Sequence, residues 1–206
     1  MKVSGAKVAE NRAALIATAK RLIQEKGFEG AGVAEISREA GLTQGALYCQ
    51  FGSKDALAAE AFRKAFADGA AIWSGLCDSA TDPLSAFLDA YLSGTHVGEV
   101  GSGCALAACI SEVRRQDEAV GAAFADGFRA MVEMVRSALP KAMPPEAARR
   151  CALALVSALV GSVAMARAVE ATDRDLAREI IAAAREELGR LAAGASQPCA
   201  ARPKSP

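Results

Sequence analysis

The segment from Val33 to Leu57 (VAEISREAGLTQGALYCQFGSKDAL) constrains the fold more than any other part of the 206-residue chain. Its apolar spacing predicts a short helix from about Val33 to Ala40, and Gly41 is positioned to end that helix. Thr43 can cap a second short helix that continues through Tyr48. Two short helices joined by a glycine-containing turn are typical of a helix-turn-helix.

The second of these helices has two different faces. Leu47 and Phe51 are four residues apart and are expected to face the core, whereas Gln44 and Tyr48 lie on another face. A helix-turn-helix places such a face in the major groove, where glutamine can pair with adenine and other side chains contact phosphate. The candidate DNA contacts are Thr43, Gln44, Gly45, Ala46, Tyr48 and Lys54. Spacing alone leaves open a helical protein that never touches DNA.

The rest of the chain also predicts helices. Aromatic residues make up only 5% of the chain and no segment alternates with period two, so the fold class is all-α with about nine helices and no sheet. The first eight residues are expected to form a loose arm, and His96–Gly103 a glycine-rich loop. The other predicted helices are 10–26, one that Ser53 caps, 83–93, 104–115, 117–139, 146–170 and 173–191.

The residues themselves resemble the DNA-binding domain of the TetR/AcrR family. The matching features are Glu25-Lys26-Gly27-Phe28, Val33-x-x-Ile36, Ala40-Gly41-Leu42-Thr43-x-Gly45, Leu47-Tyr48-x-x-Phe51 and Ser53-Lys54-x-x-Leu57. The resemblance covers about residues 10–58. It implies an all-helical homodimer whose two heads read successive major grooves of a palindromic operator. It also implies an effector-binding C-terminal domain whose last two long helices form the dimer interface.

Three positions depart from common choices in that family. Gly32 stands where Thr or Ser usually caps the second short helix, and glycine caps less well. Gln44 replaces a frequent Lys, and Cys49 lies near a position that is often basic or histidine. The operator sequence therefore cannot be taken from relatives.

The predicted domains are an N-terminal arm with a helix-turn-helix (1–54), an effector-binding and dimerisation domain (55–193) and a disordered tail (194–206). An effector pocket needs apolar walls with a few polar groups, although each candidate could equally be a core residue. Tyr91, His96 and Glu112 are possible polar anchors. The candidate pocket residues are Phe66, Trp73, Phe87, Tyr91, His96, Cys104, Phe128, Met131 and Met165.

Two further hypotheses concern the C-terminal part. The apolar helix 146–170 suggests a partner subunit, and the candidate interface residues are Leu155, Leu159, Val163, Ile180 and Ala184. Cys104 follows Gly101-Ser102-Gly103 at an expected helix start, where a thiol can become more nucleophilic. An alternative is therefore a repressor that senses oxidants or electrophiles through Cys104. The other reading is that Cys104 is simply a small buried residue of the core.

Charge and composition exclude several other classes of protein function. Residues 1–54 hold eight basic and five acidic side chains while the whole chain is neutral, which suits a mildly basic DNA-reading head. The six cysteines and single histidine form no zinc-finger spacing, and no paired catalytic groups or phosphate-binding glycine loop occur. We therefore expect a cytoplasmic regulator with no cofactor or metal, and not an enzyme. A helical enzyme or carrier with an incidental helix-turn-helix is the remaining alternative.

Overall fold

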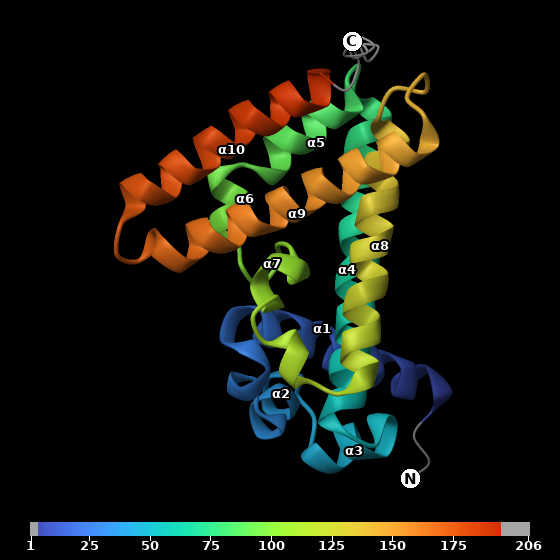
Figure 1. The fold of residues 1–206 in the computed structure, drawn as a ribbon. Coiled ribbons are helices and arrows are strands. Elements are labelled where there is room, and N and C mark those ends of the chain that lie inside the picture. Colours follow the sequence, from blue (N-terminus) through green and yellow to red (C-terminus); the bar gives the residue numbers. More distant parts are fainter. Residues whose placement is uncertain (1–3, 195–206) are drawn as a thin grey trace, which may run out of the picture. The chain divides into compact units, whose positions relative to one another are not determined.

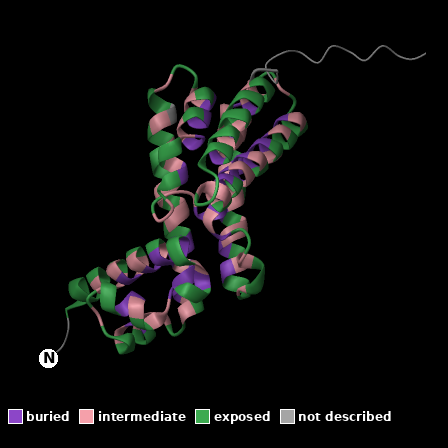
Figure 2. Cartoon of the chain, turned by 90° about the vertical axis from the view of Figure 1, so that its left-hand side faces the viewer, coloured by how far each residue is buried: buried purple, intermediate pink, exposed green. Residues whose placement is uncertain are grey.

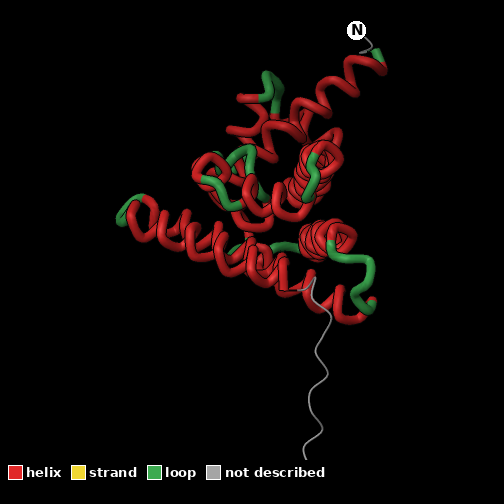
Figure 3. The backbone as a smooth tube through the Cα atoms, turned by 90° about the horizontal axis from the view of Figure 1, so that it is seen from above, coloured by secondary structure: helices red, strands yellow, loops and turns green. Residues whose placement is uncertain are grey.

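The structure is a computed structural model that describes residues 4–194, and every regular element in that range is a helix (Figures 1 and 3). This confirms the predicted all-α fold class. Ten α-helices and one 3₁₀ helix occur in the described range, where about nine helices were predicted. Their bounds are α1 Gly5–Gly30, α2 Val33–Glu39, α3 Gln44–Phe51, α4 Lys54–Ser79, α5 Pro83–Tyr91, α6 Gly94–Gly98, α7 Ala105–Cys109, η1 Val113–Arg115, α8 Glu118–Ala138, α9 Pro145–Glu170 and α10 Arg174–Gly194. Of the predicted tail, residues 195–206 lie outside the described range.

The helix starts that side-chain caps predicted are confirmed. Thr43 Oγ1 accepts a hydrogen bond from Ala46 N at 3.2 Å, and Ser53 Oγ accepts one from Ala56 N at 3.0 Å. Such caps satisfy amides that a helix leaves without a partner at its first turn. These local signals therefore fix where α3 and α4 begin.

Three predictions for local structure are wrong. Of the predicted loose arm, residues 1–3 lie outside the described range, and residues 5–8 are helical because α1 already begins at Gly5 with Ser4 as its cap. The predicted loop His96–Gly103 is wrong only at its start, because residues 94–98 form α6, in which the buried Val97 offsets the weak helix propensity of Gly94 and Gly98. The predicted helix 104–115 is broken into α7 and η1, and the turn between them places Glu112 within hydrogen-bonding distance of Phe28 N.

The chain divides into two compact units, and neither is one continuous stretch. The first holds the described residues up to Gly75 together with Gly94–Ala130, and the second holds Leu76–Ser93 with the described residues from Met131. Helices α4 and α8 each contribute to both units. The boundary between residues 54 and 55 remains a prediction.

A stack of aromatic rings organises the core of the first unit. The rings of Phe28 and Phe62 lie parallel with centroids 5.5 Å apart, and Phe62 also meets Phe66 at 5.8 Å and Phe124 at 6.3 Å. The buried residues of this unit lie on the inner faces of its helices (Figure 2). Offset or tilted ring pairs at these separations add to the stabilisation from burial, so this stack ties α1 to α4 and α8.

In the second unit, α10 packs along α9 and against α5 (Figure 1). Arg185 on α10 donates hydrogen bonds to the carbonyl oxygens of Asp89 at 3.0 Å and Leu92 at 2.7 Å. These carbonyls end α5, where a helix leaves acceptors without partners, so a charged donor stabilises the helix terminus.

Helix α9 is long and apolar enough to cross a membrane by length and composition alone. One side of it is nevertheless the core of the second unit, with Leu155, Val156 and Leu159 buried. A core helix passes the same test, so its composition carries no membrane assignment.

Gly127 on α8 leaves room for the ring of Phe66 on α4, because a Cβ built at Gly127 would overlap that ring. We expect Gly127→Ala to lower the free energy of unfolding by about 1–3 kcal/mol, since the ring or helix must move. Gly121→Ala on the same helix meets nothing within 4 Å and should leave stability equal or raised. Denaturant unfolding of both variants tests this, and equal effects would contradict it.

Candidate nucleic-acid interface

Glycine occupies the turn before α3 and the turn after it. Gly41 has φ 70° and Gly52 has φ 77°, a left-handed conformation that favours glycine. Between them Leu47 is fully buried, and Leu42 and Phe51 pack partly buried against the same core cluster. One face of α3 is therefore anchored, as the sequence predicted.

The opposite face of α3 is open. Thr43, Gln44 and Gly45 are exposed, and Tyr48 keeps 49% of its surface accessible. Ala46 is half-buried. Fully anchored on one side and polar on the other, α3 has the form of a helix that can enter a DNA groove.

Lys54 has a partner within the subunit that the sequence did not reveal. It is half-buried at the start of α4, and its Nζ donates a hydrogen bond to the carbonyl oxygen of Phe28. This bond joins the end of α1 to the beginning of α4. The predicted phosphate contact of Lys54 stays a prediction.

Arg12 holds the end of α3, and sequence reasoning missed it. Its guanidinium donates to the carbonyl oxygen of Gln50 at 2.9 Å and lies 4.2 Å from the centroid of the Phe51 ring. It also forms an ion pair with Glu60 on α4. Three elements thus meet at one side chain, and only a three-dimensional contact links residues 38 positions apart.

Ion pairs tie α1 to its neighbours. Lys26 pairs with Glu35 on α2 at 2.7 Å, and Lys20 pairs with Asp68 on α4 at 2.8 Å. Burial opposes ionisation of Asp68, but hydrogen bonds from Lys20 and Lys64 outweigh it and lower the pKa of that carboxyl. Its stabilising contribution is therefore present at neutral pH and is lost as the pH falls through the lowered pKa.

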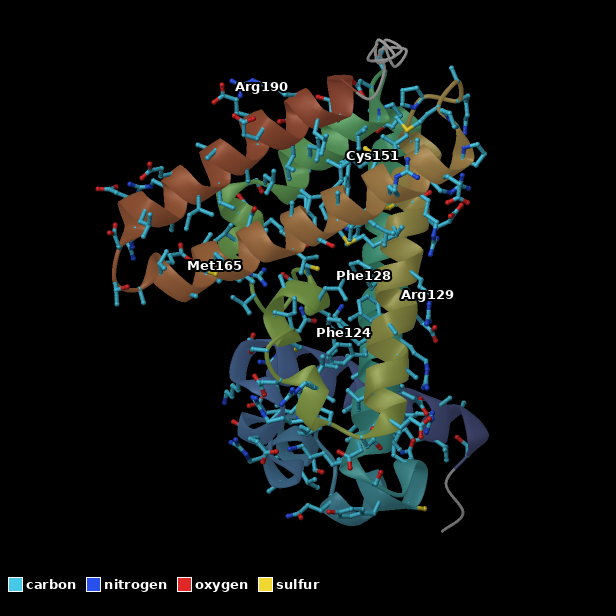
Figure 4. The ribbon with its side chains drawn as sticks, in the orientation of Figure 1. Phe124, Phe128, Arg129, Cys151, Met165 and Arg190 are labelled. Atoms are coloured by element: carbon cyan, nitrogen blue, oxygen red, sulfur yellow. The ribbon has the colours of Figure 1, made fainter. Side chains whose placement is uncertain are left out.

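The predicted pocket residues are divided between the two units. In the first unit the rings of Trp73 and His96 lie 5.8 Å apart, and Phe66 packs on Gly127. Phe128 and Cys104, both half-buried, belong to the same unit, and Figure 4 shows Phe124 and Phe128 on one side of α8 and Arg129 on another.

In the second unit Phe87 and Tyr91 are buried with ring centroids 5.5 Å apart, and Met131 is half-buried. Met165 is 57% exposed on α9, and Figure 4 marks its place there. Glu112, a predicted polar anchor, instead accepts a hydrogen bond from Phe28 N. Binding of an effector by any of the candidate pocket residues remains a prediction.

Three of the predicted interface residues require a correction. Leu155, Leu159 and Val163 are fully buried inside the second unit, so their side chains offer no surface to another subunit. Ile180 and Ala184 on α10 are half-buried. The exposed apolar surface of these helices belongs to other residues, namely Met165, Leu176 and Leu191.

Cys104 precedes a much shorter helix than the sequence predicted. Cys104 is the residue that precedes α7, but this helix has only five residues and its dipole is correspondingly small. Cys104 is half-buried, as is Cys151, whereas Cys49 is exposed. Oxidant sensing by Cys104 therefore stays a prediction.

We expect Arg12→Met to lower the free energy of unfolding by about 1–2 kcal/mol, because the Gln50 carbonyl and Glu60 lose a charged donor that is partly screened by solvent. DNA affinity should fall further than stability explains, since the end of α3 loses its anchor. Arg38→Met, at a side chain 73% exposed with ion pairs no shorter than 3.7 Å, should leave stability nearly unchanged. Unfolding and DNA titration of both variants check this.

Two family models match the chain. The model for bacterial regulatory proteins of the tetR family matches residues 15–61, which include α2 and α3. The model for the C-terminal domain of LmrA/YxaF-like transcriptional regulators matches residues 80–178. No curated protein matches the chain.

Solved structures with a similar fold include proteins named as TetR-family transcriptional regulators. The reduced form of Escherichia coli NemR is 21% identical with a TM-score of 0.73, and the match covers 87% of this chain and 95% of that one. A TetR-family regulator from Agrobacterium tumefaciens is 22% identical with a TM-score of 0.72, covering 89% and 98%. One from Chloroflexus aurantiacus is 22% identical with a TM-score of 0.73, covering 90% and 95%. The solved structures show the same fold, and the two matched family models identify the chain as a DNA-binding transcriptional regulator of the TetR family.

Proposed function

We propose that this regulator is a repressor that binds a two-fold symmetric operator as a homodimer and leaves it when a small molecule binds the C-terminal part. The observation that carries the DNA-reading role is the exposed face of α3, with Gln44, Gly45 and Tyr48 on the outside and Leu47 buried. Gln44 is the proposed reader of a base edge, and Thr43, Tyr48 and Lys54 are the proposed phosphate contacts.

Gly45 supports the proposal that the α3 backbone comes close to DNA. A Cβ at this position would meet only Thr43 Oγ1, at 3.8 Å, which is an ordinary contact. The packing of the subunit therefore does not require glycine there. A missing side chain on the exposed face is useful when another molecule approaches the backbone, and we propose that this molecule is the operator.

The proposed dimer uses the outer faces of α9 and α10. On α9 the residues Ala154, Ser157, Gly161, Met165 and Ala168 follow one another at helical spacing and are exposed or half-buried. Leu176 and Leu191 add exposed apolar surface on α10. Small residues with a flexible methionine allow two helices to approach closely, as a helical dimer interface needs.

Release from DNA is proposed to follow from the spacing of the two heads. Dimeric readers need recognition helices about 34–36 Å apart to enter successive major grooves. An effector lowers affinity when it binds better to a state with another spacing. We propose that the role is regulatory rather than catalytic and that the protein acts in the cytoplasm, where its operator lies.

Binding to the DNA upstream of its own gene is the direct test. Gln44→Ala should change which base is preferred at one position of each half-site, with a loss of about 1–3 kcal/mol for the cognate sequence. Lys54→Ala should weaken all sequences alike, because a phosphate contact carries no sequence information. Competition titrations measure both effects, and a base preference unchanged by Gln44→Ala would contradict the assigned role.

Gly161→Gln tests the dimer interface. A Cβ at Gly161 meets nothing within 4 Å in the subunit, so the larger side chain should leave the fold intact and obstruct only a neighbour. We expect monomers in sedimentation at micromolar concentration and a large loss of operator affinity. Gly121→Gln on α8, which is equally unobstructed, is the matched control. A Gly161→Gln variant that remains dimeric would place the interface elsewhere.

A further inference from the structure

The peptide groups on both sides of Phe28 are held by side chains from two distant segments. Phe28 N donates a hydrogen bond to Glu112 Oε2 at 2.9 Å, and its carbonyl oxygen accepts one from Lys54 Nζ. The Phe28 ring is 1% exposed and stacks on Phe62. The backbone at Phe28 therefore lies between an acidic group from the turn after α7 and the lysine that begins α4.

Glu112 reaches Phe28 through a space that only glycine leaves open. Gly27 has φ 76° and interrupts the helical path of α1, which leaves Phe28 N free for a side-chain acceptor. A Cβ at Gly27 would lie 2.5 Å from Glu112 Oε1. The carboxylate thus fills the position of the absent side chain.

The turn that carries Glu112 is itself held in place. Glu112 N donates to the Cys109 carbonyl oxygen at 3.0 Å, and Arg115 N donates to the Glu112 carbonyl oxygen at 2.9 Å. Cys109 is fully buried and Val113 packs against the core cluster of the first unit. The Glu112 carboxylate is therefore a fixed acceptor, and Phe28 is positioned against it.

The hydrogen bond to the Phe28 carbonyl oxygen fixes the position of the Lys54 ammonium group. An ammonium group has three donors, and the bond to Phe28 leaves two of them for phosphate oxygens. Lys54 is also the first residue of α4, and the positive end of the helix dipole there favours an anion. A lysine tethered in this way presents its charge at one place instead of sampling many rotamers.

We propose that Glu112, which does not itself read DNA, is a positioning residue for DNA binding. It fixes Phe28, and Phe28 fixes the Lys54 ammonium for a phosphate. This inference rests on the proposed function of Lys54. Electrostatics alone predicts the opposite effect of substitution, because removal of a negative charge from the head should raise affinity for a polyanion.

Three substitutions separate the two effects. Glu112→Ala removes both the charge and the acceptor. It should weaken binding of the dimer to any duplex by about a hundredfold, because each of the two subunits loses one charge-assisted contact worth about tenfold. Glu112→Gln removes the charge but keeps an oxygen that can accept from Phe28 N, so affinity should be equal or higher. Glu112→Asp keeps the charge and shortens the side chain, so any loss it causes cannot come from charge.

The decisive measurement is the slope of log affinity against log salt concentration. Each phosphate contact adds about 0.9 to that slope, so Glu112→Ala should reduce it by about 1.8 in a dimer. In a Lys54→Met background the same substitution should change the slope no further. Thermal unfolding confirms that the variants fold, and Glu112→Asp serves as the test variant if Glu112→Ala does not.

An unchanged slope in Glu112→Ala, or in the substituting Glu112→Asp, would overturn the inference and leave the proposed function intact. Equal losses in Glu112→Gln and Glu112→Ala would also overturn it, because the acceptor would then not matter. If the wild-type protein bound no duplex at all, the proposed function would fail and this inference with it.

Discussion

Phe28 directs its ring, its N–H and its carbonyl to three different partners because Gly27 before it adopts a left-handed backbone conformation. A helix that continued through this position would use both backbone groups in its own hydrogen bonds. The interruption frees them for Glu112 and Lys54, while the ring enters the core beside Phe62. The head is thereby joined to the segments that follow it by both packing and hydrogen bonds.

The parts of the fold that sequence predicts well are those decided by neighbours in the chain. Thr43 and Ser53 cap helices through bonds to residues three positions on, and Gly41 and Gly52 bound α3 because they alone tolerate its turns. Together with the spacing of Leu42 and Leu47, these signals were enough to predict which face of α3 is buried and which is exposed. The candidate site was predictable to that extent.

Contacts between distant residues were not predictable. Arg12 anchors α3 across 38 positions and Glu112 reaches Phe28 across 84, and no local pattern marks either residue. The prediction for α9 was wrong for the same reason. Leu155, Leu159 and Val163 form one apolar stripe, but periodicity does not tell whether the helix that packs on this stripe belongs to the same chain or to another. The small residues on the opposite face, such as Gly161, are the ones that we propose to contact a second subunit.

Most of the basic side chains in residues 1–54 that favour a DNA-binding role are paired with carboxylates in the structure. Residues 1–54 carry an excess of basic side chains, yet Arg12, Lys20, Arg21 and Lys26 are each paired with a carboxylate from α1, α2 or α4. These pairs hold the head together and contribute little free charge toward DNA. Lys54 differs because its hydrogen bond goes to a neutral carbonyl, which leaves its charge uncompensated by that partner. The number of basic residues thus says less about DNA affinity than the position of this one ammonium, and that position depends on the backbone at Phe28.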